Sequence, residues 1–181
     1  MNKWTLPIKT EWMKSQMEHE SSRSYAEEIY NLVKEFPYKN ALEIGAAWGL
    51  STLAILLAQD KGNLLSVDPD ETIKTPEEIK QNGLEDRWTW VESRSNKFWE
   101  NNKDIFDIIY IDGSHLYDDV HLDLHEGWKV LKNGGLMFLD DITHKANKTG
   151  EYGVSLAAWQ HIVNNNITKI ETTTRLLYFK K

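Results

Sequence analysis

The stretch ALEIGAAWGLST, residues 41–52, decides the fold of this 181-residue chain. Its apolar start over residues 41–44 predicts a buried strand, and residues 51–59 predict an apolar helix. Gly45 and Gly49 lie between the two and permit a tight turn with close backbone approach. A strand, a glycine turn and a helix in this order are typical of the start of a parallel α/β sheet.

The rest of the chain continues this alternation of strands and helices. Further strands are predicted over residues 63–67, 88–91, 105–111 and 136–139, and further helices over 75–82, from the N-cap candidate Asp118 onward, and over 154–164. Two last strands, 167–173 and 175–179, are too close for a helical crossover and should be antiparallel. We expect an α/β, doubly wound sheet with helices on both faces, formed by one domain over residues 1–181, with residues 1–20 as an N-terminal cap segment.

Composition excludes several classes of function. The chain has no cysteine, so disulfides, thiolate metal sites and cysteine nucleophiles are ruled out. Its formal net charge is -7 without a basic stripe, which argues against a nucleic-acid partner. No apolar run reaches the roughly 18 residues of a membrane span, and the first ten residues lack a secretory pattern. We expect a soluble, cytoplasmic protein that acts on a small molecule and has no membrane partner; a homo-oligomer stays open.

Polar residues follow the strands at the edge where open parallel sheets bind their ligands. Ser51 lies near a helix N-terminus, whose free amides favour an anionic group. Asp68 follows the next strand, 23 residues after Gly45, where it could accept hydrogen bonds from two ribose hydroxyls. A tight turn without a ligand is one alternative. A dinucleotide site is another, but its G-x-G-x-x-G pattern requires glycine where this chain has Ala47 and Leu50.

A group of acidic residues follows the two strands predicted at 105–111 and 136–139. Asp112 ends the first strand, and Asp140 and Asp141 end the second. If the strands are neighbours, three carboxylates converge and repel one another unless a cation is present. A hard divalent ion, Mg²⁺ above all, would resolve that repulsion. Alternatively, Asp112 binds nearby amides and the aspartate pair caps a loop.

His115 is the candidate catalytic base. It lies three residues beyond Asp112 in a loop at the same sheet edge. Imidazole titrates near neutrality and can accept the proton of a hydroxyl that a metal has acidified. A structural histidine is the alternative. His144 and Tyr117 are further candidates for the acceptor pocket.

Three motifs carry a family resemblance. The segments LEIGAAWGLST (residues 42–52) and IDGSHLY (residues 111–117), with Gly134-Gly135 leading to Asp140-Asp141, resemble class I S-adenosylmethionine (SAM) dependent methyltransferases. The chain is most similar to the small bacterial and viral group that includes metal-dependent macrolide sugar O-methyltransferases, with catechol-type O-methyltransferases as cousins. The resemblance runs from about Tyr25 to the C-terminus.

The resemblance implies a Rossmann-like, seven-stranded sheet in the order 3-2-1-4-5-7-6 with strand 7 antiparallel. It implies that Glu43 lies near the methionine end of SAM, that Ser51 binds the carboxylate, and that Asp68 binds the ribose. The other implied cofactor residues are Gly45, Ala46, Ala47, Trp48 and Gly49 around the turn, Arg94 and Ser95 near the adenine, and Asp112. At Ala47, where relatives have a second glycine, we expect the methyl group to cost little. The implied metal ligands are Asp112, Asp140 and Asp141, and a proposed base of the relatives matches His115.

The sequence therefore predicts a SAM-dependent methyltransferase that methylates a small-molecule or sugar hydroxyl. A magnesium ion would hold the acceptor and His115 would take its proton. Three alternatives stay open: a metal-independent N- or C-methyltransferase, a SAM-binding module without turnover, and a hydroxylase-type relative, for which no histidine-rich iron site is visible.

Overall fold

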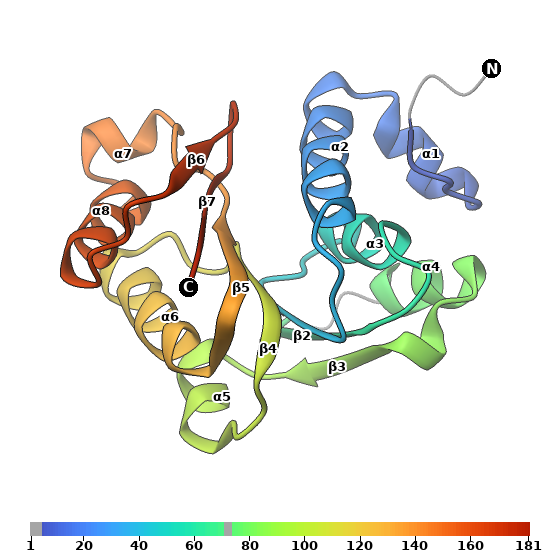
Figure 1. The fold of residues 1–181 in the computed structure, drawn as a ribbon. Coiled ribbons are helices and arrows are strands. Elements are labelled where there is room, and N and C mark those ends of the chain that lie inside the picture. The colour runs from blue at the N-terminus through green and yellow to red at the C-terminus, as the bar shows by residue number, and fades with distance from the viewer. Residues whose placement is uncertain (1–4, 71–73) are drawn as a thin grey trace.

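A computed structural model describes residues 5–70 and 74–181 and shows a seven-stranded sheet with helices on both faces (Figure 1). The strand order is β3-β2-β1-β4-β5-β7-β6, as the resemblance implied. The first five strands are parallel, β7 is antiparallel to β5, and β6 is antiparallel to β7. The strands are β1 Asn40–Ile44, β2 Asn63–Asp68, β3 Trp88–Glu92, β4 Phe106–Ile111, β5 Leu131–Leu139, β6 Ile170–Thr172 and β7 Leu177–Lys180.

The helices divide between the two faces of the sheet (Figure 1). One hydrophobic cluster joins α1, α2, α3 and α4 to one face, and a second joins α5, α6 and α8 to the other. The helices are α1 Glu11–Met17, α2 Glu20–Lys34, α3 Leu50–Leu57, α4 Lys74–Asn82, α5 Ser95–Asn101, α6 Tyr117–Val130, α7 Ala146–Thr149 and α8 Val154–Asn164, with a 3₁₀ turn, η1, over Glu85–Arg87. In the described part of the chain, none of these helices is both long and apolar enough to cross a membrane.

Strand β4 shows why the sequence folds into three layers. Its side chains alternate between the two clusters, with Ile108 and Tyr110 in the first and Ile109 and Ile111 in the second. Because both faces are covered, the strand is almost continuously apolar, as expected for the centre of a parallel sheet. Its carboxyl end therefore delivers Asp112 to the sheet edge between β1 and β5.

Three local predictions need correction. Helix α6 begins at Tyr117 after the N-cap residue Leu116, so Asp118 is not the cap but lies in the first turn, where a carboxylate still complements the helix dipole. Strand β5 begins at Leu131 instead of residue 136, and Gly134, with φ +79°, lies within it. Helix α5 was not predicted, because its seven residues SNKFWEN carry no helical apolar period.

The N-terminal segment packs against α4. Residues 1–4, including Trp4 of the predicted cap segment, lie outside the described residues. The amide of Lys9 donates to Asn82 at 3.0 Å, and the Thr10 hydroxyl donates to the Glu78 carboxylate. Met13 and Met17 are fully buried. These contacts fix α1 beside the edge of the sheet where the site lies.

Candidate active site

The glycine turn brings the ends of β1 and β4 into direct backbone contact. Gly45 has φ +87°, and a Cβ built on it would lie 2.2 Å from the carbonyl oxygen of Asp112. Only glycine fits such a position. Gly49, with φ +81°, is the N-cap residue of α3, so the free amides of that helix lie next to the turn.

Ala47 corrects the expectation that a methyl group costs little in this turn. Its φ is +42°, in the left-handed region, where a Cβ costs roughly 1–2 kcal/mol. Hydrogen bonds hold the strained residue in place. Its amide donates to Asp68 at 3.0 Å, and its carbonyl accepts from the Thr75 hydroxyl at 2.9 Å.

Asp68 fastens the end of β2 to this turn. One carboxylate oxygen accepts the amides of Ala46 and Ala47 at 2.9 and 3.0 Å, and the other accepts the amide of Asp70 at 2.9 Å. Oδ2 thus accepts two hydrogen bonds, whereas Oδ1 accepts one and keeps a lone pair for a ligand. The residue therefore both shapes the turn and offers an acceptor to the cavity beside it.

That cavity has a volume of about 520 Å³ and extends along the carboxyl ends of the parallel strands. It contains most of the predicted cofactor positions beyond the turn. Its lining includes Gly45, Ala47, Asp68, Ser93, Arg94, Ser95, Asp112, Gly113, Ser114, His115 and Asp119. We call it the cofactor cavity.

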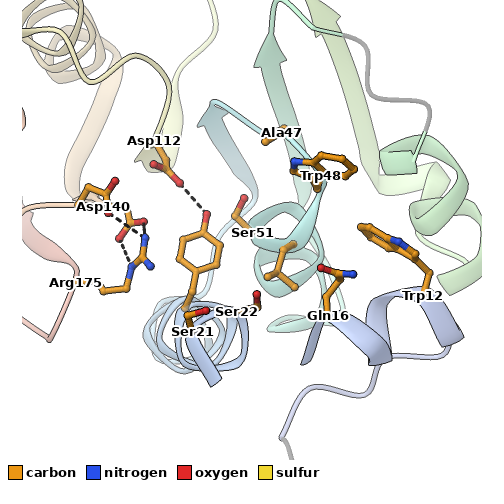
Figure 2. Close-up of a pocket in the computed structure, with 14 residues that line it drawn as sticks. Trp12, Gln16, Ser21, Ser22, Ala47, Trp48, Ser51, Asp112, Asp140 and Arg175 are labelled. Atoms are coloured by element: carbon orange, nitrogen blue, oxygen red, sulfur yellow. Dashed lines mark hydrogen bonds and ion pairs between the residues drawn. The ribbon is translucent and has the colours of Figure 1, made fainter. Parts of the chain in front are cut away.

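A second cavity of about 360 Å³ lies on the other side of the turn (Figure 2). Its walls come from α1, α2 and the turn, and its floor is acidic; the lining is Trp12, Gln16, Ser21, Ser22, Tyr25, Ala46, Ala47, Trp48, Leu50, Ser51, Asp112, Asp140, Asp141 and Arg175. The Trp12 and Trp48 rings stack at its rim with centroids 6.3 Å apart. Ala47 and Asp112 line both cavities, so the two meet there.

Glu43 lies outside both cavities. It is fully buried behind the turn, where one carboxylate oxygen accepts the hydroxyls of Thr52 and Ser66 at 2.7 and 2.6 Å. Burial raises the pKa of this carboxyl to about 7, although hydroxyl groups, that of Ser51 first, oppose the shift. That Glu43 lies near the methionine end of SAM stays a prediction of the resemblance.

Two tyrosines hold Asp112. The hydroxyls of Tyr25 and Tyr110 donate to its Oδ2 at 2.8 and 3.0 Å, and they lie 3.0 Å from each other. Burial, and next the Asp112 charge, raise the pKa of both tyrosines well above the ordinary value, so both stay protonated donors. Asp112 therefore has one occupied oxygen and a fixed orientation.

Arg175, from the segment between β6 and β7, is a cation that the sequence did not lead us to expect here. It forms a two-point ion pair with Asp140, through Nε at 3.0 Å and through a terminal nitrogen, and contacts Asp141 at 3.1 Å (Figure 2). Burial raises the pKa of Asp140 to about 6, while the hydrogen bond from Arg175 lowers it.

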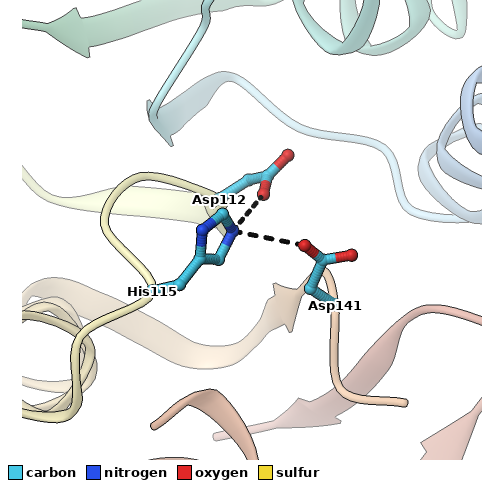
Figure 3. Close-up of side chains that lie close together, drawn as sticks. All are labelled: Asp112, His115 and Asp141. Atoms are coloured by element: carbon cyan, nitrogen blue, oxygen red, sulfur yellow. Dashed lines mark ion pairs between the residues drawn. The ribbon is translucent and has the colours of Figure 1, made fainter. Parts of the chain in front are cut away.

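His115 faces the remaining carboxylate oxygens (Figure 3). Its Nε2 lies 3.6 Å from Asp112 Oδ1 and 3.3 Å from Asp141 Oδ2. Interaction with Asp112 raises the pKa of His115, burial opposes the shift, and Asp141 adds to it. The ring stacks on Tyr152 with centroids 4.3 Å apart, which fixes its plane.

This cluster fits a divalent cation. Donor atoms of Asp112, His115 and Asp141 lie within 4.8 Å of one another, and within the described chain the buried Nε2 of His115 makes no hydrogen bond. Three carboxylates with one guanidinium leave two negative charges, which a divalent ion would balance.

The structure thus brings together most residues that the sequence singled out and adds three that it missed. Tyr25 and Tyr110 looked like ordinary apolar positions of a helix and a strand, and Arg175 belongs to no motif. No signal in the sequence pointed to the two tyrosines, and the strand order, in which β7 lies beside β5, indicates only the region in which Arg175 lies. Two weaker candidates, Tyr117 and His144, line neither cavity, although His144 stacks on Tyr152 at 4.8 Å.

Comparisons with known proteins agree with this geometry. Residues 42–142, more than half of the chain, match the family described as "Methyltransferase domain". No curated protein matches the chain.

Several solved structures share the fold at low sequence identity. The O-methyltransferase TomG from Streptomyces achromogenes, solved with SAM, is 14% identical with a TM-score of 0.73, over 97% of this chain and 92% of TomG. An O-methyltransferase from Bacillus cereus, solved with S-adenosylhomocysteine (SAH), is 16% identical with a TM-score of 0.75, over 98% and 94%. The SAH-bound methyltransferase PaMTH1 from Podospora anserina is 17% identical with a TM-score of 0.66, over 94% and 84%. The chain therefore belongs to the methyltransferase domain family and is a class I SAM-dependent methyltransferase.

Proposed function

We propose that this methyltransferase transfers the methyl group of SAM to a hydroxyl oxygen of a small-molecule acceptor, such as a sugar. One observation carries the proposal: the two cavities meet at Ala47 and Asp112, directly beside His115 and Asp141. A cofactor in one cavity and an acceptor in the other would place their reacting groups at this junction. Alignment of this kind is the main contribution an enzyme makes to methyl transfer.

The cofactor cavity suits a nucleoside with an amino-acid tail. Asp68 would accept a ribose hydroxyl through Oδ1, and Arg94 and Ser95 would lie beside the adenine. Ser51 lines the second cavity, so the tail would extend past the junction at Ala47 to bring its carboxylate to Ser51 and to the free amides of α3. The strained turn supports this arrangement, because strain at Ala47 is a cost that a binding function explains.

His115 would accept the proton of the acceptor hydroxyl. In this role His115 is a base and not a ligand of the ion: its Nε2 makes no hydrogen bond within the described chain and lies at the junction, 3.6 Å from Asp112 Oδ1 and 3.3 Å from Asp141 Oδ2. When bound between these carboxylates, a divalent cation such as Mg²⁺ would lower the pKa of a coordinated hydroxyl. Oxygen as the methyl acceptor is also what the names of TomG and the Bacillus cereus enzyme state for those proteins.

The test is SAH formation by the purified protein with SAM, Mg²⁺ and a pooled set of hydroxylated metabolites, followed by mass spectrometry of the methylated product. The proposal expects an O-methyl product, loss of turnover with EDTA, and loss of turnover with unchanged SAM affinity in His115→Ala. Asp86→Asn, an exposed aspartate of η1, is the control. An N- or C-methyl product would contradict the proposal, and turnover that survives EDTA would remove the ion from it.

A further inference from the structure

The acidic floor of the second cavity consists of Asp112, Asp140 and Asp141. These carboxylates differ in how many of their oxygens are free to bind a metal ion. Both oxygens of Asp140 are already engaged, because each accepts a different nitrogen of Arg175. Its side chain is only 1% exposed. A two-point, buried pair of this kind is strongly destabilised when one partner is withdrawn. Binding of an ion by Asp140 would require that withdrawal.

Asp112 and Asp141 each keep one oxygen. Asp112 uses Oδ2 for the two tyrosine hydroxyls, and Asp141 uses Oδ1 for Arg175. The unused oxygens, Asp112 Oδ1 and Asp141 Oδ2, are the two that face His115 in Figure 3. Of the three aspartates, only Asp112 and Asp141 therefore have an oxygen that is free to bind an ion.

Arg175 is itself held in place. Its guanidinium lies over the Tyr25 ring, 4.8 Å from the centroid, and its carbonyl accepts the amide of Ile142 at 3.2 Å. The backbone bond ties the segment between β6 and β7 to the segment after β5. A fixed arginine with a planar fork of donors is well suited to hold a carboxylate permanently.

We infer that Arg175 is a built-in counterion that withdraws Asp140 from the metal site, so that Asp112 and Asp141 are the carboxylates that hold the divalent ion. The inference rests on the ion in the proposed function and replaces the three-aspartate ligand set that the sequence implied. It assigns Arg175 a positioning role: it neutralises Asp140 and orients Asp141 without touching the acceptor.

A charge-neutral double variant tests the inference through metal binding alone. Asp140→Asn with Arg175→Gln removes one negative and one positive charge, so the net charge of the site is unchanged. Mn²⁺ is titrated as the probe, and the free aquo ion is counted by electron paramagnetic resonance. We expect the double variant to bind Mn²⁺ within about threefold of wild type, because glutamine at position 175 keeps a donor for Asp141, whereas Asp112→Asn and Asp141→Asn lose at least about tenfold. Lys132→Met, which breaks an ion pair with Asp107 elsewhere, is the control for loss of a cation.

A second measurement avoids any risk that the double variant does not fold. The Nε–H group of Arg175 donates to Asp140, and its proton–nitrogen resonance can be assigned by comparison with Arg175→Lys. On titration of wild-type protein with diamagnetic Mg²⁺, we expect this resonance to keep its protection from solvent exchange.

Three outcomes would overturn the inference. Loss of at least about tenfold in Mn²⁺ affinity in the double variant, or loss of Arg175 Nε–H protection on Mg²⁺ binding, would make Asp140 a ligand. If the wild-type protein binds no Mn²⁺, the inference is wrong, and so is the metal ion in the proposed function. Methyl transfer measured with EDTA then shows whether the rest of that proposal stands.

Discussion

Replacement of Glu43 by glutamine should change how stability depends on pH and should leave cofactor binding unchanged. The carboxyl is fully buried, and its pKa is raised from the ordinary 4.5 to about 7. In the unfolded chain the group ionises near 4.5, whereas in the folded protein it keeps its proton until about pH 7. Between these values the folded state binds more protons, so stability falls as pH rises.

The size of the effect follows from the two pKa values. Their separation corresponds to about 3 kcal/mol of stability, present below pH 4.5 and lost by about pH 7. Glutamine carries no proton to lose and can still accept the Thr52 and Ser66 hydroxyls. The free energy of unfolding of Glu43→Gln should therefore gain about 3 kcal/mol relative to wild type between pH 4.5 and 8.

The assay is urea unfolding followed by circular dichroism at several pH values, with Glu85→Gln, an exposed glutamate, as the control. SAM affinity is measured by calorimetry at pH 7.5 on the same proteins. We expect the affinity of Glu43→Gln to stay within about threefold of wild type, since Glu43 lines neither cavity. If the pH profiles of the two proteins are parallel and SAM affinity falls strongly, the raised pKa of Glu43 is wrong and the residue acts on the cofactor, as the family resemblance implied.

Two further predictions concern the fold. Gly45→Ala should destabilise the protein by at least about 2 kcal/mol in urea unfolding, because its Cβ would meet the Asp112 carbonyl at 2.2 Å. Gly134→Ala has a similar φ of +79° but no atom within 4 Å, so it should cost only about 1 kcal/mol; equal costs would show that the close approach is absent. His161 is buried and its pKa is lowered to about 4, by burial first and next by the charges of His125 and His121. The free energy of unfolding should therefore fall as pH drops from about 6.5 to 4. In His161→Phe this decrease, measured by urea unfolding, should be smaller; a decrease equal to that of wild type would contradict the lowered pKa of His161.

The sequence predicted the fold because each strand and its following turn carry local signals. The apolar run of β4, the glycine turn after β1 and the close pair of final strands together indicate a parallel sheet with one antiparallel strand. The first residue of a helix was harder to predict. Asp118 has a side chain suited to an N-cap, but it lies in the first turn of α6. Helix caps depend on side-chain geometry that spacing does not reveal.

The sequence predicted those site residues that lie at or just after the end of a strand. Asp68, Asp112 and His115 follow strands and lie at the expected edge. Arg175 and Tyr25 could not be predicted, because their contacts with the acidic floor join segments that are far apart in sequence. The positive φ of Ala47 could not be predicted from the sequence either, because tertiary contacts hold an alanine in this conformation.

Calorimetric titration of the purified protein with SAH tests the central claim most directly: that Asp68 and the glycine turn hold the cofactor in the larger cavity. We expect saturable binding to wild type and to Asp86→Asn, and at least about tenfold weaker binding to Asp68→Asn. If neither SAM nor SAH gives heat with wild-type protein while a nicotinamide dinucleotide binds, the account is contradicted.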